Sequence, residues 1–372
     1  MSWRSCKLGD VMTLKRGHDL PADSRHDGDV PVVSSSGITG HHNEAKAKAP
    51  GVITGRYGTI GQVFYLEEDY WPLNTALYVI DFKGNDPQFL AYFLRNTLKG
   101  YQSEKAAIPG VDRNVLHQIE VRSPDFDTQQ RIVAILATYD DLIENNRRRM
   151  ALLEDSARLL YCEWFVRLRF PGYEHTSIVD GVPQGWERKV LGDLCRDIRD
   201  LVLPEAMEPG TPYIGLEHMP RRSISLNEWG TVEQVTSSKN RFTSGEIIFG
   251  KIRPYFHKVG VAFVDGVASS DAIVIRPVDE ALHGLVLMTV SSDEFVAVTA
   301  QQMKEGSKMP RADWKQMQAY AVPLPPSGLL SNFDDVIQSI ISQLKALSFA
   351  NQKLRAARDL LLPRLMHGEL SA

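Results

Sequence analysis

Two long stretches of the 372-residue chain repeat apolar residues at alternating steps of four and three. This spacing is the heptad pattern of helices that pack side by side, and residues 128–170 contain neither Gly nor Pro. At 1.5 Å per residue, the first helix would span roughly 50 Å. The expected seam residues are Leu136, Ile143, Asn146, Leu153, Leu160 and Trp164 in the first stretch, and Phe333, Ile337, Leu344, Asn351, Leu354 and Leu361 in the second.

A sustained heptad pattern favours pairing of the two helices, although two amphipathic helices on separate cores would show a similar pattern. The first helix must leave one globular region and end at the next. A partner that starts there has to run back, so we expect an antiparallel pair in which Asn146 faces Asn351 and Trp164 faces Phe333. A polar pair inside an apolar seam would fix the register at some cost in stability.

The region before each helix carries the same motifs in the same order, which indicates an internal duplication. Trp3 followed by Leu8-Gly9-Asp10 recurs as Trp186 followed by Leu191-Gly192-Asp193 at the same spacing. Further matches, in chain order, pair Val52–Arg56 with Ile247–Lys251, Asn74–Val79 with Ser270–Ile275, and Pro109, Asp112 and Leu116 with Pro310, Asp313 and Met317.

The expected fold class is therefore α+β, with two pseudo-repeated, β-rich α/β domains joined by two long helices that form an antiparallel coiled coil. Short runs of Val, Ile, Tyr and Phe between Gly, Pro and Asp residues predict strands. Shorter helices are expected at Pro87–Leu98 and His283–Val290. The expected segments are domain 1 (1–127), spacer helix 1 (128–170), a linker (171–183), domain 2 (184–326), and spacer helix 2 with a C-terminal tail (327–372).

The amino-acid composition says more about the cellular compartment than about the function. A net charge of −4 excludes a uniformly basic nucleic-acid binder but allows local basic loops. Three scattered cysteines form no CxxC motif, which suits a reduced, cytoplasmic protein. The N-terminal residues do not resemble a signal peptide, and the apolar runs are too short for a membrane span, so we expect no membrane partner.

The common catalytic motifs are missing from the sequence. It contains no nucleotide-binding GxxxxGK[ST] loop, no HExxH or GxSxG motif, and no zinc-ligand spacing of Cys and His. We expect His41 and His42 to be a loop pair and not metal ligands. The chain is therefore expected to have no catalytic residue, no metal site and no cofactor of its own.

Gly-flanked loops after equivalent strands are the first candidates for DNA contact. Gly55-Arg56-Tyr57-Gly58 lacks the ending of a nucleotide loop, and Gly250-Lys251-Ile252-Arg253-Pro254-Tyr255 is its counterpart. Cations beside aromatic rings suit contacts with phosphates and base edges. Each loop could instead be a solvated hairpin tip. The candidates here are Arg56, Tyr57, Lys251, Arg253 and Tyr255.

A second pair of loops precedes Pro109 and Pro310, each of which we expect to begin a helix. Anion binding at a helix N-terminus is one interpretation, and a simple helix start is the other. A third pair follows equivalent strands and could read bases or merely turn. Together these loops supply the candidates Ser35, Ser36, Lys105, Arg113, His218, Ser307, Lys308 and Arg311.

Specific motifs at the ends of both halves resemble one family. Gln129-Gln130-Arg131-Ile132, Trp164-Phe165 and the terminal Leu361-Leu362-Pro363-Arg364-Leu365-Met366-His367-Gly368-Glu369-Leu370 are similar to the specificity subunit of type I restriction-modification enzymes. Gly245–Pro254 and Ser307–Arg311 also resemble the target recognition domains of that family. The first half departs from the pattern because no basic residue follows Pro109.

The resemblance implies a DNA-reading subunit without catalysis, in which each domain reads one half of a bipartite, asymmetric target in double-stranded DNA. Two methyltransferase subunits would dock on the helices and bring S-adenosylmethionine to a flipped base, and restriction subunits would add ATP- and Mg-dependent steps. The helix pair would act as a ruler, because roughly 50 Å is about one and a half turns of duplex at ~34 Å per turn.

Two other interpretations fit part of the sequence. A coiled-coil adaptor that presents two related protein-binding modules would show the same seam and duplication. Only the cation-aromatic loops and the family motifs favour DNA over it. A self-contained DNA enzyme is the other alternative, and the missing catalytic motifs argue against it.

Overall fold

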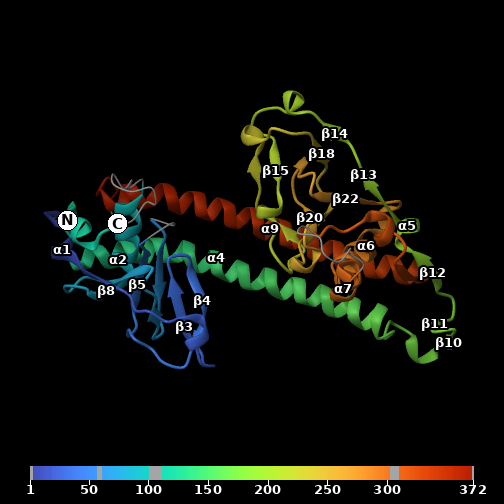
Figure 1. Ribbon diagram of the computed structural model, residues 1–372, viewed down its shortest axis with the longest axis horizontal. Coiled ribbons are helices and arrows are strands. Elements are labelled where there is room, and N and C mark those ends of the chain that lie inside the picture. The colour runs from blue at the N-terminus through green and yellow to red at the C-terminus, as the bar shows by residue number, and fades with distance from the viewer. Residues whose placement is uncertain (1–2, 57–60, 100–110, 302–309, 371–372) are drawn as a thin grey trace. The chain divides into compact units, whose positions relative to one another are not determined.

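The computed structural model describes residues 3–56, 61–99, 111–301 and 310–370, and the chain divides into two compact units (Figure 1). Unit 1 comprises Met1–Ile143 with Lys353–Ala372, and unit 2 comprises Glu144–Gln352. Each unit therefore contains part of both long helices, α4 (Phe126–Tyr161) and α9 (Ser327–Met366).

Unit 1 is built on a two-stranded ribbon and two sheets. The ribbon pairs β1 (Trp3–Lys7) antiparallel with β9 (Glu120–Pro124). The first sheet has the order β2 (Thr13–Arg16), β8 (Ala76–Asp81), β5 (Gly51–Gly55), β6 (Val63–Leu66), and the second has β4 (Gly37–His42), β3 (Val30–Ser34), β7 (Trp71–Pro72). The helical elements before α4 are α1 (Leu8–Val11), η1 (Ala22–Ser24), α2 (Pro87–Leu98) and α3 (Arg113–His117).

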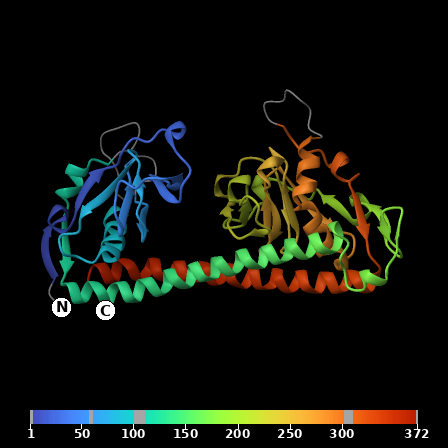
Figure 2. The same ribbon diagram turned by 90° about the horizontal axis from the view of Figure 1, so that it is seen from below.

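Helix α2 has the bounds expected from the sequence, and local chemistry explains them. Asp86 caps its N-terminus by accepting a hydrogen bond from the Phe89 amide at 2.8 Å, and Pro87 occupies the first turn, where its missing N–H costs nothing. Its buried face joins one core with Val52 and Leu77 of the sheet and with the long helices. Figure 2 shows α2 close to both long helices. The helix thus anchors the sheet to α4 and α9.

Unit 2 repeats this order with more strands. Its ribbon pairs β12 (Glu187–Val190) antiparallel with β23 (Ala321–Leu324). One sheet has the order β13 (Cys195–Ile198), β22 (Ala272–Pro277), β19 (Ile247–Gly250), β20 (Val259–Ala262), β16 (Ser225–Leu226), and the other has β14 (Leu201–Val202), β18 (Lys239–Phe242), β21 (Gly266–Ala268), β15 (Pro212–Ile214), β17 (Gly230–Thr231).

The helices of unit 2 include α6 (His283–Val290), whose bounds also match the expectation. Every residue of α6 from Gly284 to Val290 is buried, so this helix lies inside the core and not on its surface. The remaining short helices are α5 (Leu191–Leu194), η4 (Pro204–Ala206), η5 (Leu216–His218), η6 (Val232–Gln234), η7 (Pro254–Phe256), η8 (Glu280–Leu282), α7 (Asp293–Gln301) and α8 (Trp314–Met317).

The repeated Leu-Gly-Asp motif has the same structural role in each unit. Leu8 and Leu191 are fully buried, and their amides donate to Ile119 O at 2.9 Å and to Tyr320 O at 2.8 Å. A Cβ on Gly9 would lie 3.1 Å from His117 Cβ, and one on Gly192 would lie 3.1 Å from Gln318 Cβ. The glycine therefore lets the short helix after the first strand approach the segment before the last strand.

Within unit 2 the two long helices meet as the seam predicts. Asn146 Nδ2 donates to Asn351 Oδ1 at 2.9 Å, and the rings of Trp164 and Phe333 lie 5.7 Å apart, so both predicted contacts are confirmed. Asn351 is 4% exposed. The amide pair is satisfied internally, which removes most of the cost of burying it.

Within unit 1 the same helices are joined by a charged contact at a seam position. Arg358 of α9 forms an ion pair with Asp140 of α4, whose carboxylate also accepts from Tyr92 Oη at 2.6 Å. Tyr92 belongs to α2, so the network ties three helices together. Burial, together with the neighbouring Asp140, raises the pKa of Tyr92, which keeps its hydroxyl protonated.

The ends of α4 and α9 each lie against a tryptophan at the start of a ribbon. In unit 2, α4 continues as a π-helix, η2 (Cys162–Val166), and Phe165 and Phe170 pack on Trp186 at 5.6 Å and 4.8 Å. The helix thus ends before residue 170, because Leu168 takes a positive φ of 57°. In unit 1, Gly368 after α9 approaches the Trp3 indole so closely that a Cβ would lie 2.8 Å from Nε1.

Three further expectations from the sequence concern the linker, the histidine pair and membrane-spanning helices. The expected linker forms η3 (Tyr173–His175) and a small hairpin of β10 (Ile178–Val179) and β11 (Val182–Pro183). The expectation that His41 and His42 form a loop pair is wrong, since both belong to β4. Among the described residues no single helix is long and apolar enough to cross a membrane, although the bent pair Glu280–Val290 and Asp293–Gln301 passes by length and composition.

Candidate nucleic-acid interface

The candidate cation after the central strand is fixed by the same two backbone hydrogen bonds in each unit. In unit 1 the Arg56 amide donates to Thr75 O and its carbonyl accepts from the Val111 amide, both at 2.9 Å. In unit 2 the Lys251 amide donates to Asp271 O at 2.8 Å and its carbonyl accepts from the Ala312 amide at 2.9 Å. Three segments therefore meet at one edge of the sheet in each unit: the strand end, the turn before the next strand, and the segment before a short helix.

The segment that follows this edge in unit 2 places Arg253 and Tyr255 at the surface. Arg253 takes a left-handed conformation (φ 50°, ψ 60°), and its amide donates to Pro310 O at 2.9 Å. This turn starts η7, in which the Tyr255 ring packs against Phe256 at 5.0 Å and remains 52% exposed. An exposed cation beside an exposed aromatic ring is suited to phosphate contact and base stacking.

A cleft of about 510 Å³ surrounds Lys251 and contains charges of both signs. Arg199 pairs with Asp197 at 2.8 Å, and Arg311 pairs with Asp271 at 3.2 Å. Lys251 is half-buried, and burial lowers its pKa while Asp197 and Asp271 raise it. The two carboxylates thus offset part of the cost of burying the Lys251 ammonium, whose pKa remains lowered. The structure brings two of the sequence candidates, Lys251 and Arg311, to the same cleft.

In unit 1 the serine candidates lie close to the same edge through Thr75. The Ser35 amide donates to Thr75 Oγ1 at 3.4 Å, and Thr75 O is the acceptor for the Arg56 amide. Ser36 is held in the turn by its amide, which donates to Ser34 Oγ at 3.1 Å. Ser35, Ser36 and Arg56 therefore belong to one surface region.

The expectation that Pro310 begins a helix is wrong, and Pro109 lies outside the described residues. Helix α3 begins at Arg113 and α8 at Trp314, because the side chains of Asp112 and Asp313 cap the first turns. Arg113 occupies the first turn of α3 and is exposed, two residues after Val111. It therefore lies close along the chain to the edge that holds Arg56.

His218 has a local structural role in addition to any role in binding. Its Nδ1 accepts from the Gly215 amide at 3.0 Å, and its ring lies edge-on to Tyr213 at 5.8 Å, so it stabilises the turn that forms η5. Lys258 donates to Leu216 O of the same turn at 2.5 Å. Four candidates, Tyr57, Lys105, Ser307 and Lys308, lie outside the described residues.

Sequence reasoning missed the acidic residues at this edge. Asp271 stands where the first half has Thr75, within the repeated motif, so the alignment of the two halves carries the signal for it. Asp197 lies in β13 and Arg199 directly follows this strand, and no motif pointed to either residue. Their role depends on which segments the fold brings together.

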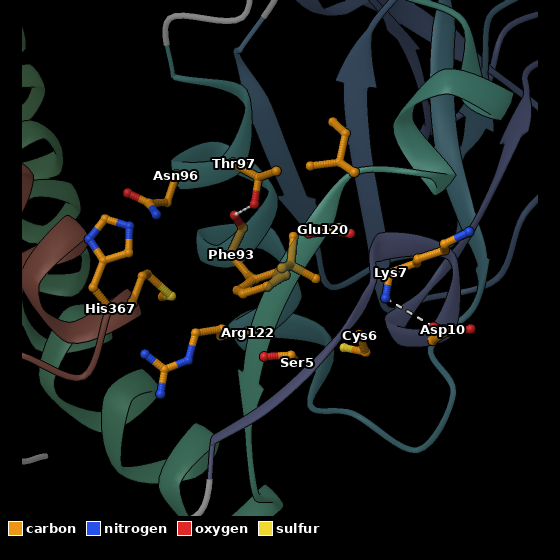
Figure 3. Close-up of a pocket in the computed structure, with 13 residues that line it drawn as sticks. Ser5, Cys6, Lys7, Asp10, Phe93, Asn96, Thr97, Glu120, Arg122 and His367 are labelled. Carbon is orange, nitrogen blue, oxygen red and sulfur yellow. Dashed lines mark hydrogen bonds between the residues drawn. The ribbon is translucent and has the colours of Figure 1, made fainter.

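A pocket of about 880 Å³ in unit 1 lies away from these candidates (Figure 3). Its walls come from β1, β9, the C-terminal half of α2 and the end of α9, with Arg122 and His367 both drawn toward the α9 side. None of the candidate DNA-binding residues that the structure describes lines it. Across the described parts of the chain, no group of three His, Cys, Asp or Glu residues is placed to hold a metal ion.

Comparison with known proteins shows which proteins this chain resembles. Residues 2–155 match the model of the type I restriction modification DNA specificity domain. The chain is 22% identical over 310 residues to the type I restriction enzyme MjaIX specificity subunit of Methanocaldococcus jannaschii, covering 76% of this chain and 69% of that protein. The chain is thus similar to type I restriction enzyme specificity subunits. The resemblance expected from the sequence is thereby confirmed.

Two further proteins match most of this chain. The type I restriction enzyme EcoDI specificity subunit of Escherichia coli is 22% identical over 353 residues, which cover 88% of this chain and 78% of that protein. The crystal structure of the S subunit of a type I restriction-modification system from M. genitalium has a TM-score of 0.61 at 14% identity and covers 98% of this chain and 96% of that one. At this identity the likeness concerns the mixed α/β fold alone.

Proposed function

We propose that this chain is the non-catalytic DNA-recognition subunit of a type I restriction-modification system and that each unit reads one half of a bipartite, asymmetric target. The observation that carries the proposal is the equivalent placement of Arg56 and Lys251, each fixed by two backbone hydrogen bonds at the same edge of its unit. Backbone anchoring keeps the Cα position constant whatever the side chain is, so a cation at this position can be directed to phosphate or base.

The candidate contacts divide into two classes by chemistry. Arg56, Arg113, Lys251 and Arg253 would supply charge for the phosphates, which positions the duplex without reading it. Ser35, Ser36, His218 and Arg311 carry hydrogen-bonding groups that can address base edges. Tyr255 offers a ring face. This division predicts that mutations in the first class weaken binding to every sequence, whereas those in the second class change the preferred sequence.

Catalysis would reside on partner subunits. Two methyltransferase subunits would supply S-adenosylmethionine chemistry, and restriction subunits would supply ATP- and Mg-dependent steps, with this chain as their common platform. The similar build of the two units supports two equivalent docking positions for one kind of partner. The proposed domains are residues 1–127 and 184–326, with spacer helices at 128–170 and 327–372.

The long helices are proposed to set the spacing between the two half-sites as an antiparallel coiled coil. The contacts of Asn146 with Asn351 and of Trp164 with Phe333 in unit 2, and of Asp140 with Arg358 in unit 1, support one fixed register. Removing seven residues from each helix should shorten the unread spacer, by about 10 Å of helix at 1.5 Å per residue, while both half-site sequences persist. An unchanged spacer would disprove the ruler.

Genome-wide mapping of methylated bases in cells that carry this chain and a methyltransferase partner tests the proposal. The expected map shows one bipartite sequence with a fixed gap, and no such sequence when this chain is deleted. Arg56→Ala should weaken methylation through one half-site and Lys251→Ala through the other. Lys189→Ala, which removes an exposed cation from β12, is the matched control and should leave the map unchanged. Methylation without a defined bipartite sequence would refute the proposal.

A further inference from the structure

The two units differ at one pair of positions beside the equivalent cations. In unit 2 the carboxylate of Asp271 pairs with the guanidinium of Arg311 at 3.2 Å. In the first half the repeated motifs place Thr75 at the position of Asp271 and Gly110 at the position of Arg311. One half therefore has both members of the ion pair, and the other half has neither.

The backbones of both residues are held in place. Asp271 O accepts from the Lys251 amide at 2.8 Å, and the Asp271 amide donates to Ser269 Oγ at 3.2 Å. Arg311 forms an antiparallel bridge with Ile252, and the next amide, Ala312, donates to Lys251 O at 2.9 Å. The pair is consequently oriented by the sheet edge and does not depend on a loose loop.

Exposure of the two side chains is unequal. The Asp271 side chain is 34% exposed, whereas that of Arg311 is 59% exposed. A guanidinium has five N–H donors in one plane, and one carboxylate contact leaves several of them directed to solvent. The carboxylate thus fixes the plane of the guanidinium and leaves donors available to a ligand.

We infer that Asp271 is a positioning residue that orients Arg311 to read a guanine in the major groove of the half-site bound by unit 2. This inference rests on the proposed function. A planar fork of N–H donors matches guanine O6 and N7, which is the commonest specific contact of arginine with DNA. The adjacent carboxylate repels phosphate, so it disfavours the sequence-independent contact that an unrestrained arginine would make.

Opposite effects on affinity and specificity distinguish this role from a merely structural one. Asp271→Asn removes the negative charge and frees Arg311 to reach a phosphate. Binding to non-specific duplex should become tighter, and the dependence of log affinity on log salt should steepen by about one unit. Discrimination against a changed guanine should fall on the order of tenfold. A purely structural loss would instead weaken binding to every duplex.

The test uses the full chain in complex with its methyltransferase partner and the target found by methylation mapping. Fluorescence anisotropy titrations compare that duplex with duplexes in which each guanine in turn is 7-deazaguanine, which lacks the N7 acceptor. The unaltered protein should bind one substituted duplex on the order of tenfold more weakly. Arg311→Ala and Asp271→Asn should abolish that difference, and Asp271→Glu should retain most of it.

Matched variants separate the outcomes. Lys189→Ala should respond to 7-deazaguanine as the unaltered protein does. Arg311→Lys keeps the charge but loses the planar fork, so it should lose the guanine preference and keep non-specific binding, and it tests the same contact if Asp271→Asn fails to fold. Equal binding of all substituted duplexes, or weaker non-specific binding by Asp271→Asn, would overturn the inference while the mapped target stands. The absence of a bipartite target would overturn both proposals.

Discussion

The two units hold their candidate cations with the same backbone contacts but surround them with different side chains. Arg56 in unit 1 and Lys251 in unit 2 each bridge two neighbouring segments, whereas the residue that accepts from their amides is Thr75 in one unit and Asp271 in the other. Backbone hydrogen bonds do not depend on side-chain identity, so one frame can present different chemistry. The comparison teaches that divergence in what a unit reads need not alter how it folds.

The cores of the two units also differ at one equivalent position, and this difference should give the largest effect. Ile132 and Phe333 each lie eight residues after Pro124 and Pro325, and both are buried. Phe333 packs against the Phe165 ring at 4.7 Å. Phe333→Ala should lower the free energy of unfolding by about 3–5 kcal/mol, and Ile132→Val by about 0.5–1.5 kcal/mol. Hydrogen exchange should place the Phe333 effect on amides of unit 2; faster exchange mainly in unit 1 would contradict it.

Buried polar networks give the next comparison. Glu154 is 7% exposed and accepts from Ser223 Oγ at 2.7 Å and Ser225 Oγ at 2.6 Å. Glu154→Ala would leave both hydroxyls without an acceptor and should cost about 2–3 kcal/mol. Asp140→Ala in unit 1 should cost less, since its side chain is 34% exposed and water can replace it. Denaturant titrations of the two variants measure the order, and a larger loss for Asp140→Ala would reverse the comparison.

Variants of Asn146 and Asn351 in unit 2 should show how much stability this polar pair costs in return for fixing the helix register. Asn146→Leu leaves the buried Asn351 amide without its partner and should destabilise the protein by about 1–3 kcal/mol. Replacing both by Leu should recover most of that loss, because no unpaired amide remains. A double-mutant cycle in urea gives the coupling. If the double variant also keeps its monodispersity in light scattering and its helix protection in hydrogen exchange, the asparagine pair has no role in specifying register.

The smallest expected effect is the part of the pH dependence of stability that His257 contributes in unit 2. Burial lowers the pKa of His257 from 6.5, Arg222 and Arg158 act in the same direction, and Asp293 and the Ser291 carbonyl oppose them. Because the folded pKa lies below the unfolded value, the unfolded state binds the proton first as the pH falls. Stability is therefore full above 6.5 and declines as the pH falls from there to the folded pKa. His257→Gln should flatten this part of the stability profile measured by thermal melting, and an identical slope would exclude His257 as its source.

Sequence reasoning succeeded where the signal is local or periodic. The bounds of α2 follow from Asp86 and Pro87, and the contact of Asn146 with Asn351 follows from the heptad spacing and the direction of the chain. It failed where two local signals compete and where the outcome depends on tertiary approach. Helix α8 starts after Asp313 and not at Pro310, because a side-chain cap outweighs the proline signal. His42 lies on a strand that pairs with β3.

The candidate site was predictable only in part for the same reason. Lys251 and Arg311 were identified because each sits in a motif, but the carboxylate of Asp271 gains its meaning from the bridge between Ile252 and Arg311, which joins segments about 60 residues apart. The turn-stabilising role of His218 likewise depends on how Gly215 and Tyr213 fold around it.

Unit 1 is built from two separate chain segments, and this affects the order in which the units can fold during synthesis. Unit 2 is one continuous segment, Glu144–Gln352, whereas unit 1 needs Lys353–Ala372 to supply Leu362, Leu365 and Met366 to its core. As the chain leaves the ribosome, unit 2 can fold first, and unit 1 keeps an apolar face uncovered until residues 353–372 have been made. A nascent chain stalled before residue 353 would accordingly present unit 1 to chaperones and proteases.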